Sequence, residues 1–147
     1  AAAPGDPRRL LQGALQALRA NEEFYAAFRA GDARRMRALW LDESSLGGSA
    51  AVDLLGAASP QDGRTVCIHP GHAPLLGHAA ICQSWDTILG SGRHPAHIWP
   101  AGCRWTLDTE GRAHVSLTER VGPGMDVPAT NAFVRTQGAW RMVAHVA

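Results

Sequence analysis

The sequence predicts an α+β fold in which helices pack on one face of an antiparallel sheet. Apolar residues recur at helical spacing in residues 7–40 and again in residues 78–90. From about residue 97 onward, four runs with alternating apolar and polar residues are separated by turn sequences, as in antiparallel strands. Helices first and strands afterwards are typical of an α+β domain. The 147 residues are expected to form a single domain.

The first helix is expected to begin at Asp6-Pro7 and to end at Gly31. Aspartate is a favoured N-cap, proline suits the first helical position, and glycine is a common C-terminal stop. The spacing of Leu11, Leu15, Leu18 and Tyr25 places these four side chains on one helical face. The pattern therefore predicts a long helix over residues 7–30.

Two shorter helices are expected after it. Asp32 caps "ARRMRALW", in which Met36, Leu39 and Trp40 face inward. Gly77 opens a third helix whose inner face carries three apolar side chains, Ile81, Trp85 and Ile88. Between these helices, residues 41–63 are rich in Gly, Ala and Ser, and predict a long surface insertion with at most one helical turn.

The strands are expected to include the short run "RTVCIH" and four longer ones. Pro70-Gly71 forms a turn after the short run. The turn sequences "DTEGR" and "TQGAW" indicate hairpins, and "GPGMDVP" indicates a wider loop. The longer strands are expected at about 97–107, 112–121, 130–136 and 139–146.

Composition excludes several functions. The formal net charge is +1 and no basic stripe is apparent, so we expect no nucleic-acid partner. The chain has no lysine, which excludes a Schiff base and a phosphate-loop lysine. No segment is long and apolar enough to predict a transmembrane span.

The opening "AAAPGDP" resembles the mature side of a cleavage site. It favours an organelle, a plastid before a mitochondrion, with the cytoplasm as the alternative.

The histidine-rich stretch "VCIHPGHAPLLGHAAICQSW" raises the question of a metal site. It holds His69, His72 and His78 together with Cys67 and Cys82. A metal needs three or four convergent ligands, and "APLLG" separates His72 from His78. We therefore expect a turn with packed histidines, no metal and no cofactor.

Four segments together resemble the SnoaL-like branch of the nuclear transport factor 2-like superfamily. They are "NEEFYAAFRAGDARRMRALW", "CIHPGHAPLLGHAAICQSW", "VSLTERV" and "ATNAFVRTQGAWRMVAH". The resemblance implies a cone: a strongly curved antiparallel sheet wraps three helices and leaves a pocket between them. The superfamily contains isomerases, cyclases, dehydratases, transport factors and non-catalytic subunits, so the fold does not assign an activity.

Glu119 and Tyr25 are the candidate catalytic residues. Val115, Leu117 and Glu119 share a strand face, so an inward Glu119 would be a carboxylate among apolar side chains, suited to acid–base chemistry. The alternative is an ion pair with Arg104 or Arg135.

The resemblance implies that a helical tyrosine such as Tyr25 could polarise a substrate carbonyl. The alternative is core packing with its hydroxyl hydrogen-bonded. The side chains expected to line the pocket are Trp40, Trp85, Asn131, Phe133 and His145.

Two functions fit these residues. The first is a non-catalytic interaction module, an accessory or scaffold subunit of a larger organellar protein complex such as one of the chloroplast. Its partners are other protein subunits, and a homodimer is a further option. The alternative is a small enzyme or carrier acting on an apolar carbonyl compound, with Glu119, Tyr25 and Asn131 in the pocket. An open cone would favour the enzyme, and a cone filled by side chains would favour the module.

Overall fold

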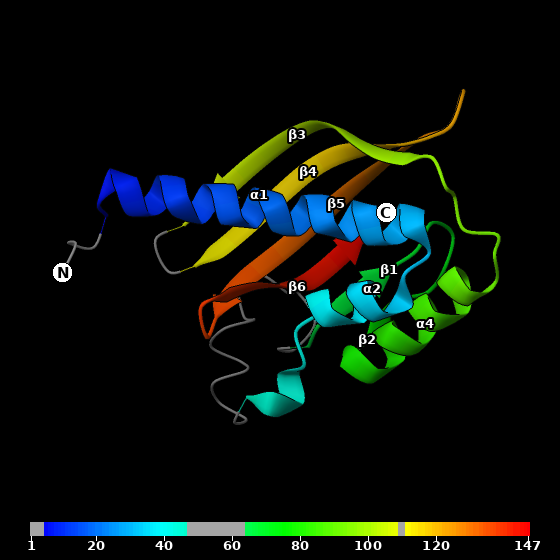
Figure 1. The fold of residues 1–147 in the computed structure, drawn as a ribbon, viewed down its shortest axis with the longest axis horizontal. Helices are drawn as coiled ribbons and strands as arrows, with labels where there is room; N and C mark the ends of the chain where they lie inside the picture. Colours follow the sequence, from blue (N-terminus) through cyan, green and yellow to red (C-terminus); the bar gives the residue numbers. More distant parts are fainter. Residues whose placement is uncertain (1–4, 47–63, 109–110) are drawn as a thin grey trace.

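A computed structural model describes residues 5–46, 64–108 and 111–147 of the chain. Along the chain, two α-helices and a 3₁₀ turn are followed by two short strands, a further α-helix and four long strands (Figure 1). The helices are α1 (Pro7–Ala30), α2 (Ala33–Leu39), the 3₁₀ turn η1 (Glu43–Ser45) and α4 (His78–Gly90). The strands are β1 (Val66–Ile68), β2 (Leu75–Leu76), β3 (Ile98–Leu107), β4 (Arg112–Val121), β5 (Asp126–Thr136) and β6 (Ala139–Val146).

The helix boundaries confirm the capping signals of the sequence. The Asp6 carboxylate accepts a hydrogen bond from the Arg8 N–H at 3.0 Å, and Pro7 occupies the first turn of α1. Gly31 ends α1 in the left-handed conformation, with φ of 65°. Asp32 then caps α2 by accepting from the Arg35 N–H at 3.0 Å.

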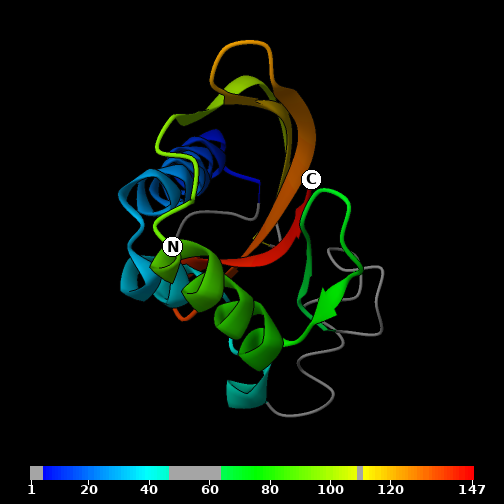
Figure 2. The same cartoon turned by 90° about the vertical axis from the view of Figure 1, so that its right-hand side faces the viewer.

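The strands form one six-stranded sheet in the order β2-β1-β6-β5-β4-β3. The pairings are antiparallel except for that of β1 with β6, which is parallel. Register shifts between Ala101 and Arg104 in β3 and between Ala132 and Phe133 in β5 bend the strands. The sheet therefore curves, as Figure 2 shows, and its two edges remain apart.

All three α-helices lie against one face of this sheet (Figures 1 and 2). The main core joins side chains of α1, α2 and α4 to the inward face of the strands. Along β4, Ala113, Val115, Leu117 and Glu119 are buried in strict alternation, which confirms that they share one face and shows that this face is the inner one. A smaller apolar cluster, which includes Leu41, lies on the opposite face of the sheet.

Two strand assignments from the sequence were wrong. β5 begins at Asp126, four residues before the expected start, so the wide loop shrinks to residues 122–125. Pro128 disfavoured an earlier start, yet it pairs with Thr118 of β4 in a part of β5 that β6 does not reach. The dipeptide β2 lies in the "APLLG" segment, where the sequence analysis expected no strand.

The surface insertion expected at about 41–63 lies mostly outside the described residues. Its first part is described: Leu41 is buried, and its N–H donates to the Met142 carbonyl at 3.0 Å. The single-domain organisation of the whole chain therefore stays a prediction. Within the described ranges, no helix is long and apolar enough to cross a membrane.

Candidate functional site

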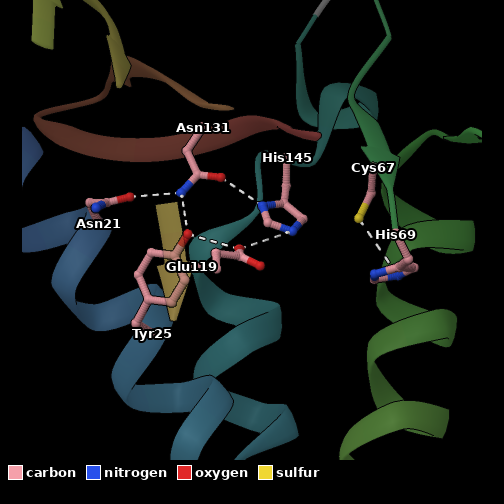
Figure 3. Close-up of polar contacts among 7 residues, drawn as sticks. All are labelled: Asn21, Tyr25, Cys67, His69, Glu119, Asn131 and His145. Atoms are coloured by element: carbon pink, nitrogen blue, oxygen red, sulfur yellow. Dashed lines mark hydrogen bonds and ion pairs between the residues drawn. The ribbon is translucent and has the colours of Figure 1, made fainter. Parts of the chain in front are cut away.

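A cluster of five polar side chains lies inside the cone (Figure 3). We call Asn21, Tyr25, Glu119, Asn131 and His145 the cone cluster. They come from α1, β4, β5 and β6. Each is at most 3% exposed to solvent. The structure thus brings together four residues that the sequence analysis named as candidates for the cone interior, and adds Asn21.

Local geometry explains why these side chains meet. Asn21 and Tyr25 are one helical turn apart on the inner face of α1. Asn131 and His145 are direct cross-strand partners in the β5–β6 register. Glu119 projects from the inner face of the neighbouring strand β4. The curvature of the sheet directs all three strand residues toward the helix.

The hydrogen bonds of the cone cluster run in one direction. The Asn131 carbonyl can only accept, so His145 donates to it from Nδ1, over 2.6 Å. The Asn131 amide donates to the Asn21 side-chain oxygen at 2.8 Å and to the Tyr25 hydroxyl at 3.2 Å. The Tyr25 hydroxyl donates to Glu119 Oε1 at 2.9 Å. The chain of donors therefore ends on the Glu119 carboxyl.

Burial sets the electrostatics of the cluster. Desolvation raises the pKa of Glu119 to about 7, although the Tyr25 hydrogen bond opposes this rise. The partners of Glu119 are Tyr25 and His145 rather than Arg104 or Arg135, so no guanidinium of β3 or β5 offsets the burial.

His145 and Tyr25 are held in their neutral forms. Burial lowers the pKa of His145 to about 3, with a smaller contribution from His69. The 3.7 Å approach of its Nε2 to Glu119 Oε1 is therefore a contact with a neutral ring rather than an ion pair. Burial and the neighbouring Glu119 carboxyl raise the pKa of Tyr25 well above its usual value.

Apolar side chains fill the space around the cone cluster. Trp85 packs edge-to-face on Phe24, with ring centroids 5.5 Å apart, and Phe133 stacks on Trp105 at 6.2 Å. Phe24, Trp85 and Phe133 are at most 1% exposed. Trp40 is also buried, at the end of α2, where it forms a bridge with Met142. These aromatic residues, expected to line a pocket, are packed in the core.

Several clefts open on the surface of the described molecule. Five clefts of about 180 to about 600 Å³ have linings that do not include Glu119, Asn131 or His145. The nearest to the cluster, of about 530 Å³ between α1 and β3, is lined in part by Tyr25, Arg29 and Trp99. Arg29 closes this side of the cone: its Nη1 donates to the Ile98 carbonyl at 2.8 Å, and its guanidinium lies 3.7 Å from the Trp99 ring centre.

The histidine-rich stretch forms separate pairs. His69 Nε2 lies 3.0 Å from Ser84 Oγ and 3.7 Å from Cys67 Sγ, while His78 Nε2 lies 3.4 Å from Cys82 Sγ. Among the residues that the structure describes, no group of three or more His, Cys, Asp or Glu is placed to hold a metal ion. Burial lowers the pKa of His69, consistent with a packed, neutral ring.

The outer face of α1 differs from the sequence-based expectation. Leu11, Leu15 and Leu18 are 64%, 50% and 40% exposed, whereas Tyr25 is fully buried. The inner face of the same half of the helix is formed by the small residues Gly13 and Ala17. The four residues expected to share one face thus divide into an exposed apolar stripe and a core tyrosine.

Comparison with solved structures identifies the fold. Three solved proteins overlap most of the chain. A proposed dehydratase of the NTF2-like family from Streptomyces avermitilis has 24% identity and a TM-score of 0.71, and the match covers 93% of this chain and 95% of that one. An NTF2-like protein of unknown function from Pseudomonas putida has 18% identity and a TM-score of 0.67, with 90% and 84% covered. A proposed calcium/calmodulin-dependent protein kinase type II association domain from Thiobacillus denitrificans has 25% identity and a TM-score of 0.56, with 86% and 89% covered.

These likenesses define the class of protein. The chain is an α+β cone with the nuclear transport factor 2-like fold. This confirms the resemblance at the level of the fold. No protein-family model and no curated protein matches the sequence. The neighbours carry different or no assigned functions, so the fold alone does not choose between the two candidate functions.

Proposed function

We propose that the chain is a non-catalytic interaction module, an accessory or scaffold subunit that contacts other proteins through its outer faces. The observation that carries this proposal is the packed interior of the cone. Small-molecule sites are concave cavities of roughly 300–1,000 Å³ with a few convergent polar groups. Here the polar groups converge, but they are at most 3% exposed and bind one another.

In the interaction module, the cone cluster serves the stability and packing of the core rather than catalysis. Buried polar groups are costly unless they are hydrogen-bonded, and satisfied networks fix a single packing of the core. The cluster ties Asn21 and Tyr25 of α1 to β4 and β5, and through Asn131 to His145 of β6. It therefore fixes how the long helix sits on the sheet.

The exposed surface supports contacts with other proteins. Three leucines on one face of α1 are 40–64% exposed, and contiguous exposed apolar side chains are typical of interaction sites. The Thiobacillus denitrificans neighbour carries a name that refers to association, at 25% identity. An organellar complex, as the sequence predicts, is part of the proposal.

The test is native electrophoresis of the endogenous protein after cell fractionation, with mass spectrometry of what co-migrates. We expect migration in an assembly of several different subunits, in the organellar fraction. The same experiment on Glu119→Gln serves as a control, because Glu119 is buried away from the outer faces and a glutamine oxygen can still accept the Tyr25 hydrogen bond, so the assembly should stay intact. Migration as a free chain, or only with copies of itself, would contradict an accessory-subunit function.

An acid–base enzyme is the second candidate, and the Glu119–Tyr25 pair favours it. A carboxyl with a pKa of about 7 suits proton abstraction at neutral pH, and a tyrosine hydroxyl can polarise a carbonyl oxygen. The Streptomyces avermitilis neighbour carries a proposed dehydratase name. This function requires the interior to open and admit an apolar carbonyl compound. A bound ligand that shifts the NMR signals of Glu119 and Tyr25, with turnover abolished in Glu119→Gln, would support it over the module.

A further inference from the structure

The helix α1 has two apolar faces on opposite sides. At 100° per residue, Phe24 and Gly13 of the inner face lie about 160–180° around the helix from Leu15. The outer side carries Leu11, Leu15 and Leu18, which we call the leucine stripe. No helix or strand of the described chain lies over this side of α1 in Figures 1 and 2. One face of α1 is thus buried in the cone, and no described helix or strand covers the other.

The charges at the two ends of the leucine stripe are opposite. On the same helical projection Arg8 and Glu22 lie within about 20° of Leu15, seven residues before and after it. Both are exposed, and in the described parts of the chain neither has an ion-pair partner. The stripe therefore begins with a free cation and ends with a free anion.

We propose that the leucine stripe docks against the leucine stripe of a second copy of this chain, with the two α1 helices antiparallel. A two-fold axis at Leu15 places Leu11 of one copy against Leu18 of the other. The same axis sets Arg8 of each copy opposite Glu22 of the other, which forms one ion pair at each end. The register follows from the spacing, because Arg8 and Glu22 are equidistant from Leu15.

The charge order favours a second copy over other occupants. A stripe with a cation at one end and an anion at the other is complementary to itself only in the antiparallel orientation. A membrane-binding helix instead carries basic residues along its polar face without acidic neighbours. The N-terminal half of α1 carries Arg8, Arg9 and Arg19, but Glu22 and Glu23 follow at once, so the charge around the stripe is mixed rather than basic. The seam spans about 21 Å of helix between Arg8 and Glu22, so the interface is small and the dimer is expected to be weak.

This inference deepens the proposed function and rests on it, since it names a partner for the interaction module. The test is sedimentation equilibrium of the purified full chain, from about 1 to about 300 µM, a range in which a weak dimer dissociates and forms. We expect a monomer at the lowest concentration and a dimer at the highest.

Leu15→Arg is expected to weaken the dimer at least about ten-fold, because it buries two like charges at the axis. Met125→Arg, at an equally exposed apolar residue (57%) in the β4–β5 turn, is the matched control and should leave the dimer unchanged.

Charge exchange tests the antiparallel register. Arg8→Glu or Glu22→Arg alone sets like charges together at both ends and should weaken the dimer several-fold. The double variant restores both pairs and should recover the wild-type Kd. All sites are exposed, so circular dichroism and the thermal midpoint should stay unchanged. The proposal would be overturned if the wild type stayed monomeric at every concentration. It would also be overturned if Leu15→Arg did not weaken the dimer, or if the double variant did not recover the wild-type Kd.

The two proposals fail in different ways. A purified monomer, with an endogenous chain that still migrates in a large assembly, would reject the dimer and leave the interaction module standing. A purified dimer, with an endogenous chain that migrates only as that dimer, would support the second copy and reject the accessory subunit.

Discussion

Glu119 is the residue on which the two candidate functions differ most. Its carboxyl is 3% exposed and accepts one hydrogen bond, from Tyr25. An ionised carboxylate in such a site lacks the two or three donors that would stabilise its charge. The pKa of Glu119 is raised for this reason, and ionisation of the carboxyl lowers the stability of the fold.

The cost predicts a pH-dependent gain in stability for Glu119→Gln. The folded pKa is about 7 and the ordinary value is 4.5, so the folded state binds more protons than the unfolded state between these pH values. The contribution of Glu119 to the free energy of unfolding of the wild type therefore falls as the pH rises from 4.5 to about 7. We expect the variant to gain about 3 kcal/mol relative to wild type between pH 4 and pH 8, measured by urea unfolding.

His145 has the opposite pH dependence. Its folded pKa is about 3, below the ordinary 6.5, so the unfolded state binds more protons between these values. Its contribution to stability rises with pH in that window and masks part of the loss from Glu119. The difference between wild type and Glu119→Gln isolates the carboxyl. A difference that stays constant from pH 4 to pH 8 would show that Glu119 is solvated.

The sequence predicted the members of the cone cluster better than their pairing. Alternation along β4 placed Glu119 inward, and Tyr25 was named on chemical grounds. The distance between them along the chain is 94 residues, and only the curvature of the sheet brings them together. Asn21 was missed, although an amide one turn before Tyr25 on an otherwise apolar face was a usable signal.

At the scale of elements, the helices were predictable because their signals are local. Asp6-Pro7, Gly31 and Asp32 fix helix ends through bonds within a few residues. The start of β5 depends on its pairing with β4, and β2 depends on β1, so neither is encoded locally. The exposure of the leucine stripe was likewise unpredictable, because spacing shows that side chains share a face but not what covers that face.

The turn from α1 to α2 predicts a position-specific cost for an added methyl group. Gly31 has φ of 65°, and a Cβ there would lie 2.5 Å from His94 Cε1. Gly92 also has a positive φ, of 68°, but a Cβ there meets nothing within 4 Å. We expect Gly92→Ala to cost about 1 kcal/mol and Gly31→Ala about 2 kcal/mol, by urea unfolding. Equal losses would mean that His94 moves aside freely.

At the scale of the whole molecule, one core joins every described α-helix to the sheet. The main apolar cluster contains side chains from α1, α2 and α4 and from five of the six strands, with β2 packed against it through Leu75. Such a core predicts a single cooperative unfolding transition, with equal calorimetric and van't Hoff enthalpies. Two separate transitions in calorimetry would contradict the prediction of one domain.

The central claim is that the cone is closed, so that the chain functions through its outer surface. The most direct measurement is exchange of the Tyr25 hydroxyl proton with water, followed by NMR on ring-labelled tyrosine. Tyr25 is the one tyrosine of the sequence, so its signal needs no assignment. The closed cone predicts a resolved hydroxyl signal that exchanges as slowly as the most protected core amides. Exchange as fast as in the unfolded chain would show that water reaches the cluster, which would contradict the closed cone and favour a small-molecule site.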